Sequence, residues 1–298
     1  MGETTLGKAL DDYKTIYMPY RNFAERTRVE YLNDLEDLKR FMEKSGIHHV
    51  KQLGLLIIEE YVAHLEQKGF VGLTRKRKVV AIRSFLSFLY QDGYLGTNIA
   101  NRVILPFTES ALPHVLTQAE CDQLRKVCAD NPRDSAIIEL LLQTGMKLSE
   151  ITSLTLNDVE LEKSQGAAEK HSGFIRILGG RGKKERLVPL NIKASLALEN
   201  YLGARMDTEN NILFMNRFGE PLGARGVQKT LRKHLKSAGI ERASIQTLRH
   251  TFGAHHIAKG TSLKTIQEVM GLKDARSTSV YLSLAKAVVT REMQDNAL

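Results

Sequence analysis

Two residues near the carboxyl end of the chain, Arg249 and Tyr281, have the chemistry needed to act on a phosphate group. A guanidinium can bind phosphate oxygens through two parallel hydrogen bonds. A tyrosine hydroxyl can act as a nucleophile once its proton is removed. Both residues lie within the stretch 246–281, which reads QTLRHTFGAHHIAKGTSLKTIQEVMGLKDARSTSVY. We therefore interpret this stretch as a phosphate-handling unit.

Helices are expected to position these two residues. Apolar residues recur at three- and four-residue intervals on both sides of Gly260, which fits the end of a helix. The spacing predicts that Arg249 and Tyr281 lie on separate helices of one compact unit. Tyr281 falls in a Ser/Thr-rich stretch that we interpret as a turn, and a last helix is predicted over 285–295.

Composition favours a nucleic-acid partner. The chain has 298 residues, enough for two domains, and a formal net charge of +9. This charge favours a polyanion, most simply nucleic acid. An acidic membrane surface is the alternative, but no clustered basic amphipathic helix supports it. No apolar run could span a bilayer and no signal peptide is recognisable, so a cytoplasmic, nucleoid-associated protein is expected.

The cysteines and histidines are expected to be structural. Cys121 and Cys128 lie two helical turns apart, about 10 Å along the axis, which is too far for a disulfide. We expect both to be buried, reduced thiols. No Cys/His cluster has the spacing of a zinc site, so no metal is expected.

The first ~105 residues predict a helical domain by their periodicity. Its four main helices are expected over 6–17, 27–44, 55–68 and 74–92. The fourth opens with a basic run: Arg75, Lys76, Arg77, Lys78 and then Arg83. Clustered charges ordinarily mark a solvated helix face, but a purely cationic run on a cationic chain favours contact with phosphates. Thr74 is expected to cap this helix and present its amides to a phosphate.

The rest of the chain mixes helices and strands. Two prolines in 106–116 mark a linker, and Thr117 and Glu120 form a capping box that begins a new helix. The following elements are expected: a turn over 131–134, a core helix over 135–144, strands over 173–178, 185–190 and 211–216, a hairpin tip at 179–182 and a basic helix over 224–237.

Four motifs occur in a characteristic order: TGMKLSEI at 144–151, GRGKKERLVPL at 180–190, LRHTF at 248–252 and TIQEVMG at 265–271, with Tyr281 ten residues after the last glycine. In these motifs, and over nearly its whole length, the chain resembles the tyrosine recombinases of the Xer and phage-integrase type. The resemblance implies a mainly α fold with a small antiparallel sheet, arranged as a two-domain, C-shaped clamp on duplex DNA.

The resemblance also implies domain roles and partners. Residues 1–105 would form a helical, SAM-like core-binding domain, 106–116 a linker and 117–298 the catalytic domain, whose segment 284–298 docks on a neighbouring protomer. Four protomers would assemble on two duplexes, and an accessory protein or a second recombinase is a further candidate partner. Arg225 and Lys229 of the basic helix would contact DNA together with the run at 74–83.

The chemistry implied by the resemblance needs neither a metal nor a nucleotide cofactor. Tyr281 would attack the scissile phosphate, forming a 3′-phosphotyrosine bond and a free 5′-hydroxyl. Arg249 would bind the phosphate, and Glu150 matches an accessory acid of the family. Cationic groups must meet the negative charge that develops on the non-bridging oxygens, and the leaving 5′-oxygen needs a proton.

Four positions depart from the family pattern. Lys147 stands where the family has an arginine, Arg181 where it has a lysine, Gln246 where it has a histidine, and Leu272 where it has histidine or tryptophan. Lys147 keeps the charge but loses the two-pronged geometry of a guanidinium.

The departures also affect proton transfer. Arg181 is too basic to give up a proton readily, so Lys183 or Lys184 would have to serve as the acid. Gln246 cannot act as acid or base near neutral pH. His250 is a candidate substitute, with a structural hydrogen bond as its other interpretation.

Two function classes remain open from the residues alone. The first is an active recombinase with an unusual pocket, working in integration, resolution or inversion. The second is a DNA-binding protein of the same fold that has lost catalysis, or an engineered active-site variant. The four replacements favour the second, whereas the retained Tyr281 and Arg249 favour the first, because DNA binding alone does not require that tyrosine.

Overall fold

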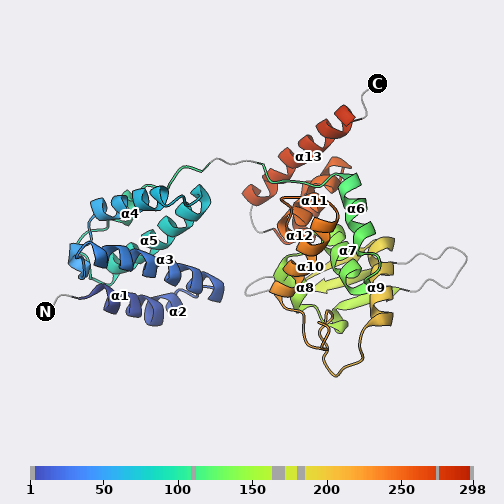
Figure 1. Cartoon of the computed structure of the whole chain (residues 1–298), viewed down its shortest axis with the longest axis horizontal. Coiled ribbons are helices and arrows are strands. Elements are labelled where there is room, and N and C mark those ends of the chain that lie inside the picture. The colour runs from blue at the N-terminus through green and yellow to red at the C-terminus, as the bar shows by residue number, and fades with distance from the viewer. Residues whose placement is uncertain (1–3, 109–111, 163–171, 180–184, 273–274, 296–298) are drawn as a thin grey trace, which may run out of the picture. The chain divides into compact units, whose positions relative to one another are not determined.

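The chain folds into two compact units, residues 1–111 and 112–298 (Figure 1). The computed structural model describes residues 4–108, 112–162, 172–179, 185–272 and 275–295. The division between the units falls inside the stretch 106–116. None of the helices in these described ranges is long and apolar enough to cross a membrane.

The first unit is helical, as the sequence predicts. Its elements are α1 (Leu6–Asp12), a π-helical turn (Tyr13–Tyr17), α2 (Met18–Tyr20), α3 (Glu25–Lys44), a 3₁₀ turn (Val50–Gln52), α4 (Leu55–Gln67), α5 (Gly72–Gln91) and a 3₁₀ turn (Ala100–Arg102). Apolar side chains from α1, α3, α4 and α5 form its core, with Ile58, Ile82 and Leu86 fully buried.

The expected cap of α5 is wrong. The helix begins at Gly72, with Val71 as its N-cap, and no side chain caps it. Thr74 is already the third helical residue, and its amide donates to the Val71 carbonyl at 2.9 Å. The Thr74 amide is therefore part of the helix and is not presented to a phosphate.

The second unit combines helices with one small sheet. Its elements are α6 (Gln118–Cys128), α7 (Pro132–Thr144), α8 (Leu148–Ser153), a 3₁₀ turn (Leu156–Asp158), β1 (Val159–Glu162), β2 (Ser172–Ile177), β3 (Arg186–Leu190), α9 (Ile192–Ala204), α10 (Ala224–Ser237), α11 (Ile245–Ala258), α12 (Leu263–Met270) and α13 (Ala275–Asp295). The sheet is antiparallel, in the order β1-β2-β3, with Ile175 opposite both Val159 and Val188.

Three local predictions for this unit are wrong. The third strand is β1, because the apolar run at 211–216 makes only isolated bridges through Ile212 and Met215 and otherwise fills the core. The expected turn at 131–134 is the start of α7: Asn131 is the N-cap, and Pro132 has the fixed φ that suits the first helical residue. The last helix begins at Ala275 instead of residue 285.

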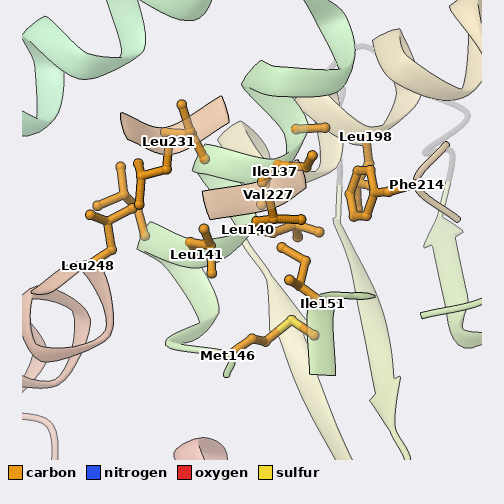
Figure 2. Packing of buried hydrophobic residues seen from close by; sticks show 14 of the residues in the cluster. Ile137, Leu140, Leu141, Met146, Ile151, Leu198, Phe214, Val227, Leu231 and Leu248 are labelled. Carbon is orange, nitrogen blue, oxygen red and sulfur yellow. The ribbon is translucent and has the colours of Figure 1, made fainter. Parts of the chain in front are cut away.

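The core of the second unit surrounds α7 (Figure 2). Ile137, Leu140 and Leu141 of α7 are completely buried and pack with residues of the helices around them, such as Val227 of α10 and Leu248 of α11. α7 therefore fixes α11, the helix that carries Arg249. Cys121 and Cys128 are buried free thiols, as predicted, and burial raises the pKa of Cys121 to about 11.

A smaller cluster joins α11, α12 and α13. It contains Phe252, Met270, Tyr281 and Leu284, all nearly inaccessible to solvent. This packing explains why the Ser/Thr-rich stretch before Tyr281 is helical despite its weak intrinsic propensity, because buried apolar contacts outweigh local preference.

Candidate active site

Arg249 lies at the centre of the site. It is on α11, whose N-cap Ser244 accepts from the Thr247 amide. The guanidinium is only 3% exposed and donates to the carbonyl oxygens of Gly145 and, at 2.7 Å, of Met270. Burial lowers the pKa of Arg249, and the negative charges that Tyr281 and Glu150 can carry oppose this effect. The backbone thus holds a buried cation in one orientation.

The turn between α7 and α8 supplies the next cation, Lys147. Gly145 ends α7 in a left-handed conformation with φ 59°, and a Cβ at this position would lie 2.6 Å from the ring of Phe252. Only glycine therefore suits the turn. Lys147 Nζ lies 3.5 Å from Glu150 Oε1 and 3.5 Å from the carbonyl oxygen of Gly271.

Glu150 is shared between two cations. It accepts from the Lys147 amide at 2.8 Å and, at 3.1 and 2.8 Å, from both terminal nitrogens of Arg186. Burial alone would raise the pKa of Glu150, but the hydrogen bonds from Arg186 and Lys147 outweigh burial and lower it. Glu150 is therefore held as a carboxylate that orients neighbouring cations.

Arg186 is a site residue that the sequence motifs did not predict. In sequence it is merely the arginine that precedes an apolar strand, yet its side chain is 14% exposed and turned into the site. Its Nε donates to the Val269 carbonyl at 2.7 Å. The signal that could have found it is the buried acid Glu150, which needs a cationic partner of matching geometry.

Tyr281 of α13 lies beside Arg249, on the neighbouring α11. Its side chain is 2% exposed, and its ring packs directly over Gly253, where a Cβ would lie 2.5 Å from two ring carbons. Burial raises the pKa of Tyr281, while the charge of Arg249 and a hydrogen bond with it act in the opposite direction. A nucleophilic role therefore requires the hydroxyl to become exposed and to lose its proton. The positive charge of Arg249 favours that loss.

His250 and Gln246 form a pair on one face of α11. Gln246 Nε2 and His250 Nε2 are 3.1 Å apart. An amide nitrogen can only donate, so the ring accepts at Nε2 and carries its proton on Nδ1. Nδ1 is buried without a partner among the described residues, and the ring centroid lies 5.5 Å from that of Tyr281. Burial and then the charge of Arg249 lower the pKa of His250.

The remaining predicted catalytic residues divide into two groups. Leu272 is partly buried against the cluster around Tyr281, and its backbone amide donates to the Gln267 carbonyl. It therefore supplies an apolar wall where the family pattern has a donor. Arg181, Lys183 and Lys184 lie outside the described residues.

The basic run on α5 splits into internal and exposed cations. Lys78 is 4% exposed and pairs with Asp34 at 3.0 Å and Asp37 at 2.7 Å. Arg77 also pairs with Asp34. Burial raises the pKa of Asp34, although both cations act to lower it. Lys78 and Arg77 are therefore committed to acidic residues of α3.

The other predicted DNA contacts differ in their exposure. Arg75 pairs with Glu66 of α4 at 2.6 Å, and Arg83 donates to the Ala100 carbonyl at 3.1 Å. Lys76 is exposed, as are Arg225 and Lys229 on α10. These three cations, and not the whole run, are available to a polyanion in this structure.

Arginine and lysine groups from three segments thus meet beside a tyrosine. Such an arrangement can neutralise a phosphoryl group under attack. In the described part of the chain, no group of three His, Cys, Asp or Glu residues could hold a metal ion.

Comparison with known proteins confirms the resemblance. Residues 114–287 match the phage integrase family, and residues 10–93 match the phage integrase N-terminal SAM-like domain. The chain is 30% identical to "Tyrosine recombinase XerC" of Bacillus subtilis, covering 90% of this chain and 89% of that protein. It is 33% identical to "Tyrosine recombinase XerC" of Pelotomaculum thermopropionicum, covering 91% and 92%.

Solved structures share the fold. The XerH site-specific recombinase bound to a palindromic difH substrate matches with a TM-score of 0.74 and 19% identity, over 97% of this chain and 84% of that chain. A lambda integrase dimer bound to a COC′ core site matches with a TM-score of 0.75 and 16% identity, over 94% and 77%. With both family matches and relatives aligned over most of their length, the chain belongs to the phage integrase family of tyrosine recombinases.

Proposed function

We propose that the chain catalyses site-specific strand exchange in duplex DNA through a 3′-phosphotyrosine intermediate. The observation that carries this proposal is the position of Tyr281 beside the buried Arg249, where Lys147 and Arg186 also converge. Relatives named tyrosine recombinase XerC and the DNA-bound lambda integrase and XerH structures support it.

The reaction assigns a role to each group. Tyr281 Oη loses its proton to solvent and attacks phosphorus, the bond to the 5′-oxygen breaks, and the 3′ end of the cut DNA strand is held as a phosphotyrosine diester. Arg249 and Lys147 bind the non-bridging oxygens as charge develops on them. The 5′-oxygen takes a proton from the loop that carries Arg181, Lys183 and Lys184. Attack by a 5′-hydroxyl on the diester reverses these steps and returns the proton to Tyr281.

Substrate binding must rearrange the site. Tyr281 and Arg249 are 2% and 3% exposed, so neither can reach a phosphate in this state. Displacement of α13 from α11 would expose both, and the free N–H groups of Arg249 would then meet phosphate oxygens while the Gly145 and Met270 carbonyls continue to orient the guanidinium. DNA binding would provide the energy, using exposed cations such as Lys76, Arg225 and Lys229.

The proposed assembly has residues 1–105 and 117–298 holding one duplex between them, with four protomers on two duplexes. The last helix would contact a neighbouring protomer through its exposed apolar residues Val289 and Met293. Association with the nucleoid would follow from this DNA binding, and an accessory protein or a second recombinase would be a further partner.

A trapped covalent adduct tests the proposal. A binding duplex is first selected from a pool of random-sequence DNA, and a nick is placed near its centre so that the cleaved fragment diffuses away. We expect a protein–DNA band that survives denaturant in the unmodified chain and is absent in Tyr281→Phe. Tight, specific binding without any such band would leave a DNA-binding protein that has lost catalysis as the better account.

A further inference from the structure

Three cations that are far apart in sequence donate hydrogen bonds to carbonyls at the carboxyl end of α12. The carbonyl of Val269 accepts from Arg186, that of Met270 from Arg249 and that of Gly271 from Lys147, at 2.7, 2.7 and 3.5 Å. Unsatisfied carbonyls at a helix end carry partial negative charge. The end of α12 is therefore the common anchor of the cations.

Arg186 is hydrogen-bonded through its whole guanidinium group. All three guanidinium nitrogens donate, Nε to α12 and the two terminal nitrogens to Glu150 at the start of α8. It begins β3, opposite Ile177 of β2. Arg186 thus ties one edge of the sheet to two helices at once.

The fit around Arg186 is close. Gly271 has φ 60°, and a Cβ there would lie 3.0 Å from a terminal nitrogen of Arg186. A lysine could not replace these contacts, because one ammonium cannot span both Glu150 oxygens and the Val269 carbonyl with the planar geometry of a guanidinium.

We propose that Arg186 is a positioning residue for DNA cleavage, setting the distance between Lys147 and Arg249 through its shared partners. This inference rests on the proposed strand-exchange function. With Arg186 in place, both Glu150 oxygens are occupied and the end of α12 is fixed. Without it, Glu150 draws Lys147 toward itself, and the Met270 carbonyl that orients Arg249 loses its neighbouring anchor.

This role predicts an effect on the chemical step and not on DNA affinity. Misplacing a catalytic group by about 1 Å can slow a reaction about 100-fold, and loss of a supporting contact typically lowers activity by about 10- to 100-fold. We expect Arg186→Lys to reduce the single-turnover rate of adduct formation at saturating DNA by about 10- to 100-fold. We expect its dissociation constant for the same duplex to stay within about twofold of the unmodified value, because no phosphate contact is removed.

The experiment uses the full chain and the selected, nicked duplex. Arg176→Lys is the matched control, since Arg176 lies on the neighbouring strand opposite Leu187, outside the site. Glu150→Gln is the second variant, because it keeps Arg186 and removes the negative charge of its partner. The double variant should form the adduct at the rate of the slower single variant, within about threefold. This is expected when two residues act as one unit.

The outcomes separate this inference from the proposed function. An adduct that forms equally fast in Arg186→Lys and Arg176→Lys would refute the positioning role while leaving the enzyme intact. Rate losses that multiply in the double variant would refute it too, because Arg186 and Glu150 would then act separately. No adduct in the unmodified chain would refute both the function and the inference.

Discussion

Gly253 is expected to determine whether Tyr281 can pack in its observed position. A Cβ at residue 253 would lie 2.5 Å from two Tyr281 ring carbons and 3.1 Å from the sulfur of Met270. Carbon atoms in contact normally lie about 3.5–4.0 Å apart. The ring in Gly253→Ala must therefore move by roughly 1 Å, or α13 must move with it.

Two opposing effects set the change in stability. Alanine is favoured over glycine inside a helix by about 1 kcal/mol. Overpacking a buried site costs about 1–3 kcal/mol. We expect the free energy of unfolding of Gly253→Ala to fall by about 0–2 kcal/mol. A displacement of the nucleophile by about 1 Å should slow adduct formation roughly 100-fold.

Gly203 provides the matched control. It is also a helical glycine, near the end of α9, but a Cβ there would meet no atom within 4 Å. Gly203→Ala should gain about 0.5–1 kcal/mol and cleave at the unmodified rate. Urea unfolding and single-turnover adduct formation on both variants measure the contrast. If Gly253→Ala is stabilised as much as Gly203→Ala and cleaves normally, the close packing of Tyr281 on α11 does not control the nucleophile.

Three further expectations follow from the site and from α5. Lys147→Arg should raise the rate of adduct formation about tenfold, because a guanidinium can bind two phosphate oxygens; an unchanged rate would show that Lys147 does not contact the phosphate. Because the pKa of Glu150 is lowered, its carboxylate stabilises the fold above the ordinary pKa of 4.5, and this contribution is lost as the pH falls through the lowered pKa. The difference in unfolding free energy between the unmodified chain and Glu150→Gln should therefore shrink in acid. A difference that does not change with pH would contradict this. Lys78→Ala should destabilise the first unit by up to about 3–5 kcal/mol in urea unfolding, because buried Asp34 then keeps only Arg77 as a cationic partner. Lys76→Ala should instead lower the salt dependence of DNA binding by about one unit. If Lys78→Ala changed the salt dependence and Lys76→Ala the stability, Lys78 would be the residue that faces DNA.

The sequence predicted the class of fold and much of the helical framework. The periodicity of apolar residues located the helices of the first unit and α10, and the placement of Arg249 and Tyr281 on separate helices agrees with α11 and α13. These features depend on local spacing, which the sequence contains directly. The family resemblance supplied the order of the motifs, and with it the expectation that they share one site.

Tertiary contacts explain what the sequence did not predict. Lys78 belongs to a basic run, and only the packing of α3 on α5 buries it beside Asp34. Arg186 has no local feature that marks it, because both its partners are distant in the chain. The predicted start of the last helix, residue 285, is ten residues too late because 277–279 are all Ser or Thr, and the buried residues Tyr281 and Leu284 stabilise this part of α13.

The three carbonyls at the end of α12 also affect when the site can exist. Residues 147, 186 and 249 come from three separate segments, and each is held by the same last helical turn. If that turn unravels, all three cations lose an anchor together. A nascent or partly unfolded chain therefore has no assembled cleavage site, even if it already binds DNA through its exposed lysines and arginines. Cleavage of a DNA strand would therefore depend on complete folding around the end of α12, even where DNA binding does not.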